Sequence, residues 1–96
     1  MKIVKEALAG TLESSDLMVR VFPDDELDIV LKSDVIQQFG RQIERVVRET
    51  LAKLDVTSGQ FLIEDKGALD SVIIARVQTA VMRGADSWTD DWSALS

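Results

Sequence analysis

The sequence predicts an α+β fold in which a small, mostly antiparallel sheet packs against two helices. Three observations lead to this prediction. Apolar residues alternate with period two in the first third of the chain, they recur every three or four residues in two later segments, and a short β-rich segment separates those two. The expected order is β-β-β-α-β-α, and two layers are its simplest arrangement. With 96 residues, the chain has the size of one domain.

Three strands are expected in the first third of the chain, at residues 7–12, 17–22 and 27–32. One face of the second strand and one face of the third are apolar, and these faces hold Leu17, Val19 and Val21, and Leu27, Ile29 and Leu31. Residues 23–26, Pro-Asp-Asp-Glu, have the chemistry of a turn, because proline presets φ and aspartate bonds to nearby backbone. Strand, tight turn and strand together predict an antiparallel hairpin of 17–22 with 27–32.

Two helices and a fourth strand are expected in the rest of the chain. Asp34 and Gln37 fit a capping box at the start of the first helix. Its buried face recurs at helical spacing and comprises Ile36, Phe39, Ile43, Val47, Thr50 and Leu54. Residues 61–64 form a short strand, and a second helix follows over 68–83, with Gly84 placed to end it. The buried stripe of that helix comprises Leu69, Ile73, Val77, Ala80 and Val81.

Residues 1–84 are expected to form one domain, since no repeat or long linker divides them. Residues 85–96 form an acidic tail that contains Trp88 and Trp92 and has no clear period. Aromatic side chains often anchor interfaces. The two tryptophans are therefore either folded back on the domain or held for a partner.

The composition excludes most kinds of unaided catalysis. The chain has no cysteine and no histidine, so it lacks disulfides, thiolate nucleophiles, imidazole bases and the metal ligands that these residues provide. A chain of 96 residues buries one modest core and has little material for a deep active site. We therefore expect a protein that is not itself an enzyme.

The net charge of −6 argues against nucleic-acid binding, which requires cations that neutralise phosphates. Six acidic residues and one base, Arg20, lie between Glu13 and Asp28. This excess predicts a solvated surface, which is the simpler interpretation, or an end of the molecule that docks a partner rich in lysine and arginine.

No apolar run approaches the roughly 20 residues that a membrane-spanning helix needs. Lysine and glutamate interrupt the first six residues, which is not typical of a signal peptide. We therefore expect a cytoplasmic protein without a membrane span.

Two clusters of reactive residues have simple structural explanations. The acids at 24–26 and the pair Glu64-Asp65 lack the spacing of a calcium loop, so turn formation and solubility explain them better. Asp70 and Ser71, at a helix start, are similar to the Asp-Ser-Leu signature of ordinary phosphopantetheine carriers. Those carriers are all-helical, whereas Ser71 follows β-rich sequence. First-turn helix residues are the better interpretation of Asp70 and Ser71.

The turn after the first expected strand presents two adjacent hydroxyls, Ser14 and Ser15. Four consecutive polar residues interrupt the apolar pattern there, so the turn should be exposed. A serine hydroxyl is a poor nucleophile without a base, and no histidine is present to supply one. From the residues alone, Ser14 is either an ordinary loop serine or a site that another enzyme modifies.

Residues 9–21 (AGTLESSDLMVRV) closely resemble the start of citrate lyase acyl carrier proteins, the gamma subunits of that enzyme. Residues 38–40 (Gln-Phe-Gly) and 65–70 (Asp-Lys-Gly-Ala-Leu-Asp) also resemble this family, as do the chain length and the lysine-isoleucine start. The resemblance extends to about residue 83, and the acidic tail has no part in it.

The resemblance implies that Ser14 carries 2'-(5''-phosphoribosyl)-3'-dephospho-coenzyme A through a phosphodiester. The thiol of this arm would hold acetyl and citryl groups. A transferase (alpha) subunit would exchange them, and a lyase (beta) subunit would cleave the citryl thioester to oxaloacetate. Dedicated enzymes would install and acetylate the arm. This agrees with the composition, because a cysteine-free chain takes part in thioester chemistry only through a cofactor.

Two alternatives stay open from the sequence. The carrier subunit of malonate decarboxylase uses the same kind of arm, and an acidic protein-interaction module would leave Ser14 an ordinary loop residue. Arg20, in the strand after Ser14, either contacts the phosphates of the arm or is an exposed residue that balances nearby acids.

Overall fold

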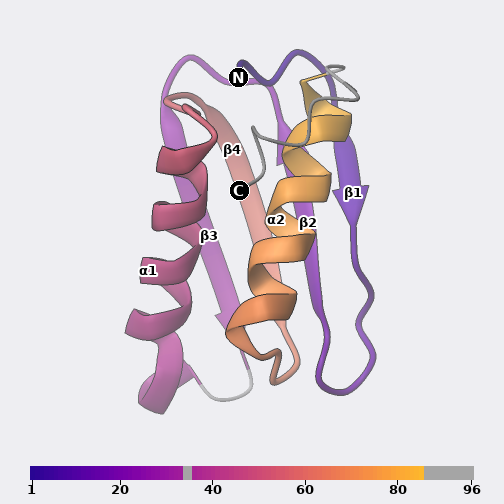
Figure 1. Cartoon of the computed structure of the whole chain (residues 1–96), viewed down its shortest axis with the longest axis vertical. Helices are drawn as coiled ribbons and strands as arrows, with labels where there is room; N and C mark the ends of the chain where they lie inside the picture. The colour runs from indigo at the N-terminus through magenta and orange to yellow at the C-terminus, as the bar shows by residue number, and fades with distance from the viewer. Residues whose placement is uncertain (34–35, 86–96) are drawn as a thin grey trace.

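A computed structural model of the protein describes residues 1–33 and 36–85, and in these residues it has four strands and two helices in the predicted order (Figure 1). The strands are β1 (Ala7–Ala9), β2 (Leu17–Phe22), β3 (Leu27–Ser33) and β4 (Gly59–Asp65), and the helices are α1 (Ile36–Lys53) and α2 (Asp70–Gly84). The predicted α+β fold is confirmed. The expected helix cap at Asp34, the side chains of residues 36–39 and the tail from residue 86, with Trp88 and Trp92, lie outside the described residues.

The four strands form one mixed sheet in the order β1-β2-β4-β3. Strand β2 pairs antiparallel with β1 and with β4, whereas β3 pairs parallel with β4. Two of the three pairings are therefore antiparallel, as predicted. Helix α1 joins the parallel strands β3 and β4, which is the usual connection for such a pair (Figure 1).

The predicted hairpin between residues 17–22 and 27–32 is wrong, because β4 lies between β2 and β3. Two-residue hairpin turns need residues with left-handed φ, usually glycine or asparagine. Residues 23–26 contain neither residue type, and none of them has a positive φ. The link instead spans the width of one strand, and the Glu26 carbonyl accepts a hydrogen bond from the N–H of Gly59 at 2.9 Å.

Both helices cover the same face of the sheet, and the core lies between these two layers (Figure 1). The predicted inner face of β2 is completely buried, as are most of the predicted helix stripes. The predicted face of β3, with Leu27, Ile29 and Leu31, packs against the core but is only half-buried. The largest buried side chains include Phe61, Leu17, Leu51, Ile63 and Ile73. Leu69 was expected in the α2 stripe, but it is 73% exposed. It precedes the helix as its N-cap residue with extended backbone, so the helical period does not apply to it.

Gly84 is the last residue of α2, as predicted, but not because it adopts a left-handed cap. The residue after it, Ala85, has right-handed backbone angles. A Cβ added to Gly84 would lie 2.7 Å from Cγ2 of Val21, and the Gly84 carbonyl accepts hydrogen bonds from the N–H groups of Val4 and Lys5 at 3.0 and 3.1 Å. The glycine therefore permits the N-terminal segment and β2 to pack closely on the helix end.

Candidate functional site

Ser14 lies in the loop of residues 10–16 that joins β1 to β2 (Figure 1). This loop sits at the end of the sheet where β4 runs into α2, and the N-terminus lies at the opposite end. The Ser14 side chain is exposed, as expected, and it forms no hydrogen bond with any other residue that the structure describes. Its hydroxyl is therefore accessible to a modifying enzyme.

The loop begins three residues earlier than the sequence predicted, because β1 ends at Ala9 and not at residue 12. Gly10 has a φ of +87°, which turns the chain out of the strand. A Cβ at this position would lie only 1.8 Å from the carbonyl oxygen of Leu17. Only glycine lets the start of the loop pass so close to the start of β2.

Asp16 holds the two arms of the loop together and is itself mostly buried, with 13% of its side chain exposed. It accepts hydrogen bonds from Oγ1 of Thr11 at 2.6 Å and from the N–H of Leu17 at 2.7 Å. Arg76, on α2, donates to both carboxylate oxygens, each at 3.0 Å. This bidentate pair ties the loop to the helix layer.

The Arg76 guanidinium, followed by the Thr11 hydroxyl and the Leu17 N–H, holds the pKa of Asp16 well below its usual range. Asp16 is therefore ionised and fully engaged at neutral pH. It lies two residues from Ser14 in the sequence, but each of its carboxylate oxygens already accepts two hydrogen bonds, so it is not placed to act as a base for that serine.

Backbone hydrogen bonds attach the loop to the β4–α2 turn as well. The Ser15 N–H donates to the Lys66 carbonyl at 2.8 Å, and the Lys66 N–H donates to the Asp16 carbonyl at 2.9 Å. Ser15 has a φ of 65°, a left-handed conformation that is uncommon outside glycine. The loop therefore presents the exposed Ser14 side chain at a fixed position.

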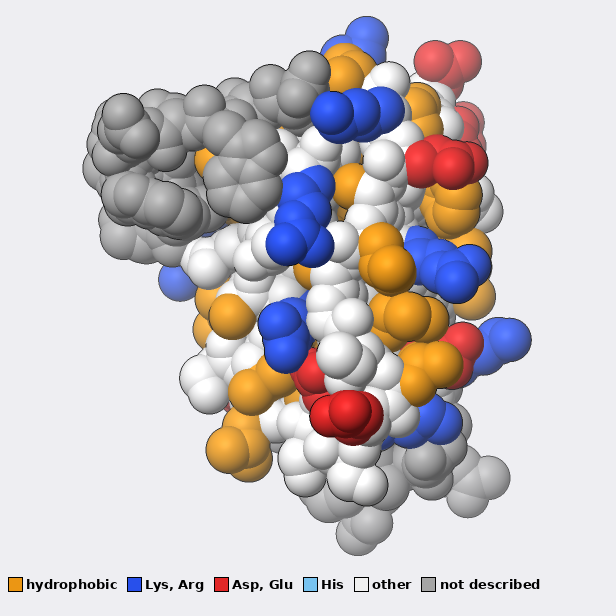
Figure 2. Space-filling view, turned by 90° about the vertical axis from the view of Figure 1, so that its right-hand side faces the viewer, with side chains coloured by type: hydrophobic (Ala, Val, Ile, Leu, Met, Phe, Trp, Pro, Cys, Tyr) orange, Lys and Arg blue, Asp and Glu red, His pale blue; other side chains and the backbone are white. Residues whose placement is uncertain are grey.

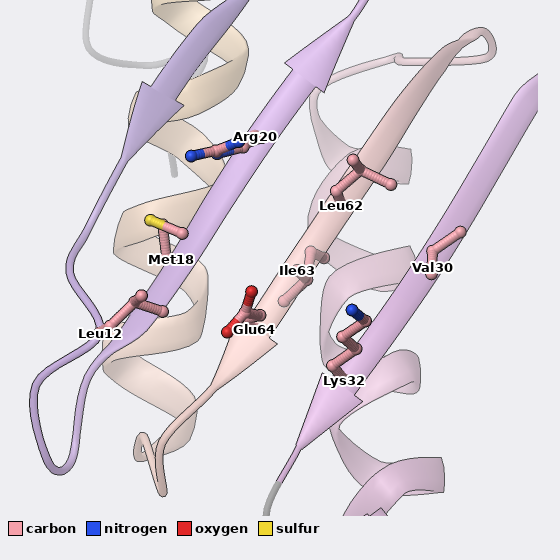
Figure 3. A pocket seen from close by; sticks show the side chains of 8 residues that line it. All are labelled: Leu12, Met18, Arg20, Val30, Lys32, Leu62, Ile63 and Glu64. Atoms are coloured by element: carbon pink, nitrogen blue, oxygen red, sulfur yellow. The ribbon is translucent and has the colours of Figure 1, made fainter.

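The face of the sheet opposite the helices is open, and it carries a shallow groove of about 430 Å³ (Figure 3). The groove runs from the Ser14 loop across β2, β4 and β3. Its lining combines apolar and charged side chains: Leu12, Met18, Arg20, Val30, Lys32, Leu62, Ile63 and Glu64.

The model of the family described as Malonate decarboxylase delta subunit (MdcD) matches residues 4–84. Proteins named citrate lyase acyl carrier protein align along the whole chain. The protein from Rhodopseudomonas palustris (strain BisA53) is 62% identical over 97 residues, which cover 100% of both chains. The protein from Haemophilus influenzae (strain PittEE) is 60% identical over 95 residues, which cover 99% of both chains.

The chain belongs to the citrate lyase acyl carrier protein family. The resemblance on residues 9–21, 38–40 and 65–70 is thereby confirmed at the level of the family. A solved structure from Thermus thermophilus has a TM-score of 0.57 and 15% identity, and the match covers 90% of this chain and 16% of the other. At that identity the likeness shows a shared fold only.

The fold of this citrate lyase acyl carrier protein family member separates Ser71 from the serine of all-helical carriers. Ser71 is exposed in the first turn of α2, as predicted for a helix-start residue, and Asp70 is the first residue of that helix. Asp70 accepts weak hydrogen bonds from Nε2 of Gln42 at 3.3 and 3.4 Å. A sheet precedes this helix, so the comparison with ordinary phosphopantetheine carriers does not extend beyond the Asp-Ser pair.

The acidic pair Glu64-Asp65 does not act as one site, because successive strand residues point to opposite faces. Asp65 is buried and accepts hydrogen bonds from Oγ of Ser33 at 2.9 Å and from the N–H groups of Gly67 and Ala68 at 3.1 and 2.9 Å. Glu64 lines the open groove. The turn role predicted for these acids is confirmed for Asp65. Within residues 1–33 and 36–85, no acidic cluster is arranged to hold a metal ion.

The six acids between Glu13 and Asp28 do not form one docking end, which was the alternative to a solvated surface, because the sheet separates them. Glu13 and Asp16 belong to the Ser14 loop, whereas the acids at 24–26 lie at the other end, where β2 leads into β3 (Figure 1). Figure 2 shows acidic side chains near the upper and lower ends of the β1 side of the molecule, with basic ones between them.

Neither described helix has the length and apolar character needed to cross a membrane.

The contact that the sequence did not predict is the Asp16–Arg76 pair, which joins residues 60 positions apart. Asp16→Asn should lower the free energy of unfolding by about 1–2 kcal/mol at pH 7, because it removes charged hydrogen bonds to a half-exposed arginine. The folded-state pKa of Asp16 is depressed, so its contribution to stability is complete above the unfolded pKa of about 3.9 and is lost as the pH falls from there toward the folded-state pKa.

Urea unfolding at pH 7 and at pH 3 measures this effect. The difference between the wild-type chain and Asp16→Asn should be smaller at pH 3. Asp28→Asn, an exposed residue with the same change in charge, is the control and should show little difference at either pH. A difference for Asp16→Asn that does not change with pH would show that its ionised form does not stabilise the loop.

Proposed function

We propose that the chain is the acyl carrier subunit of citrate lyase and carries acetyl and citryl groups on an arm attached to Ser14. The observation that carries this proposal is the alignment, at 62% identity and along its whole length, with a protein named citrate lyase acyl carrier protein. The hydroxyl of Ser14 supports the choice of residue, because it is exposed on a fixed loop and forms no hydrogen bond with a described residue. We further propose that residues 1–84 are the carrier domain, since the core that the described residues 1–33 and 36–85 form runs from Ile3 to Met82.

The residues near Ser14 fit a large phosphodiester-linked group. The hydroxyl faces solvent, its neighbours Ser15 and Gly10 are small, and no described side chain covers it. When attached, 2'-(5''-phosphoribosyl)-3'-dephospho-coenzyme A supplies the thiol that this cysteine-free chain lacks. The chain itself then fixes where the arm starts, through Asp16, Gly10 and the backbone of Lys66.

The proposed partners are the transferase (alpha) and lyase (beta) subunits, together with the enzymes that load and acetylate the arm. The sequence of the carrier chain offers no histidine base and no thiol, and the described residues of that chain form no metal site. The proposed role is therefore delivery: a tethered substrate reaches two active sites at high effective concentration. We propose that this happens in the cytoplasm.

The first test is the intact mass of the chain purified from a cell that also holds its loading enzymes. A carrier should show one large adduct that contains phosphorus and adenine. An acidic interaction module would show only the mass of the 96 residues. Recovery of the bare chain from loading-competent cells would contradict the proposal.

A second candidate is the carrier subunit of malonate decarboxylase, which the description of the matching family model favours. Reconstitution separates the two. The loaded chain with the transferase and lyase subunits of citrate lyase should form oxaloacetate from citrate, and omission of any one component should abolish this. Activity with the malonate decarboxylase subunits instead would select the second candidate, and citrate cleavage by the chain alone would refute a carrier role.

A further inference from the structure

The open face of the sheet lies directly beside the proposed attachment point. Its groove starts at Leu12, two residues before Ser14, and continues over the strands that lack a helix on this side (Figure 3). An arm attached to Ser14 therefore has a hollowed surface within immediate reach.

Two cations face this groove from strands on either side of β4. Arg20 lies on β2 opposite Leu62, and Lys32 lies on β3 opposite Glu64. Both are exposed, and within the described part of the chain neither forms an ion pair. By contrast, several other arginines bind a carboxylate or a carbonyl oxygen, and these are Arg45, Arg48, Arg76 and Arg83.

The pairing register places the two cations far enough apart to bind separate phosphates. They are two strand spacings apart, or about 10 Å across the sheet. Glu64 is the one carboxylate in the groove lining, and it lies next to Lys32 rather than Arg20. Arg20 lies opposite the apolar Leu62, and its planar guanidinium suits a phosphate.

The groove also presents apolar side chains beside the two cations. Leu12 is 49% exposed and Val30 is 41% exposed, and Met18 and Leu62 complete the strip. Covering such side chains removes apolar surface from water, which favours contact with an apolar ligand. A nucleotide with an attached pantetheine chain combines anionic groups with apolar and aromatic surface, which matches this alternation of cations and apolar residues.

We infer that the open sheet face is a resting site for the proposed arm, with Arg20 and Lys32 binding its phosphates and the strip of Leu12, Met18, Leu62 and Val30 covering its apolar part. The inference rests on the proposed attachment at Ser14. Because the arm is tethered, weak contacts suffice to hold it. A partner subunit that binds the arm more tightly then withdraws it from the face.

Nuclear magnetic resonance of the ¹⁵N-labelled chain tests this directly, with the loaded chain compared against the unloaded one. Loading should shift the amide signals of Arg20, Leu62 and Val30 as well as those of the Ser14 loop, and it should shift the ³¹P signals of the arm relative to the free nucleotide. In Arg20→Gln/Lys32→Gln, the adduct mass and the loop shifts should remain, while the shifts on the sheet face should be lost.

The control is Arg41→Gln/Lys53→Gln, which removes two exposed cations from α1, on the other face of the sheet. It should keep all of the loading-dependent shifts. Shifts confined to the loop in a chain that carries the adduct would overturn the inference and leave the proposed function intact. So would shifts on the sheet face that appear only when a partner subunit is added. A chain without the adduct would overturn both.

Discussion

Ser14→Ala should give a folded chain that carries no adduct when it is produced together with its loading enzymes. The hydroxyl oxygen of Ser14 is the proposed link to the arm, and alanine offers no replacement atom. The side chain is exposed and forms no hydrogen bond with a described residue, so the free energy of unfolding should change by less than about 0.5 kcal/mol. Intact mass and a thermal melt measure the two effects on the same sample.

Two matched serines provide the controls for this substitution. Ser15→Ala removes the adjacent hydroxyl, and Ser71→Ala removes the hydroxyl at the start of α2 at the same end of the molecule. Both variants should still acquire the full adduct. A Ser14→Ala chain that loads, or a Ser71→Ala chain that does not, would move the attachment site away from Ser14.

Gly10→Ala should destabilise the protein more than any other conservative change in the Ser14 loop. The left-handed φ of +87° costs an alanine about 1–2 kcal/mol. The added Cβ would also lie 1.8 Å from the Leu17 carbonyl oxygen, so the backbone itself would have to move. We expect a loss of about 3 kcal/mol or more in the free energy of unfolding, measured by urea denaturation.

Gly67→Ala separates the cost of the left-handed backbone from the cost of the steric clash with Leu17. Gly67 has a nearly identical φ of +90°, but nothing lies within 4 Å of its added Cβ. That variant should lose only the conformational term, about 1–2 kcal/mol. Equal losses for the two variants would show that the contact with Leu17 does not fix the loop, and that another interaction positions Ser14.

The local elements were predictable because each depends on a periodic pattern in neighbouring residues. The strand predicted at 17–22 is found at Leu17–Phe22, and its inner face is buried as expected. The pairing was not predictable in the same way. Nothing in residues 17–32 reveals that a strand more than 25 residues later lies between their two strands, so the turn at 23–26 predicted a hairpin that does not form.

The site was predictable only in part, for the same reason. The exposure of Ser14 follows from a run of polar residues, which is a local signal. The loop that holds it depends on Arg76 and the carbonyl of Lys66, which are distant in the sequence. Sequence alone therefore does not distinguish Asp16 from a surface acid, and it predicts a strand where Gly10 turns the chain.

The order of acidic residues along the sequence also did not predict where they lie on the folded protein. Counting acids along residues 13–28 left one docking end open as an alternative to a solvated surface, but a strand of six residues carries the chain from one end of the sheet to the other. The same strand places Arg20 in the lining of the groove on the open face. Counting charges along the sequence does not predict this position.

Peptide mass mapping of the loaded protein tests the central claim, the carriage of an arm on Ser14, most directly. Trypsin should release residues 6–20, which contain Ser14 and Ser15, and residues 67–76, which contain Ser71. We predict that the entire adduct lies on residues 6–20 and that fragmentation places it on Ser14. An adduct on residues 67–76, or on Ser15, would contradict the account.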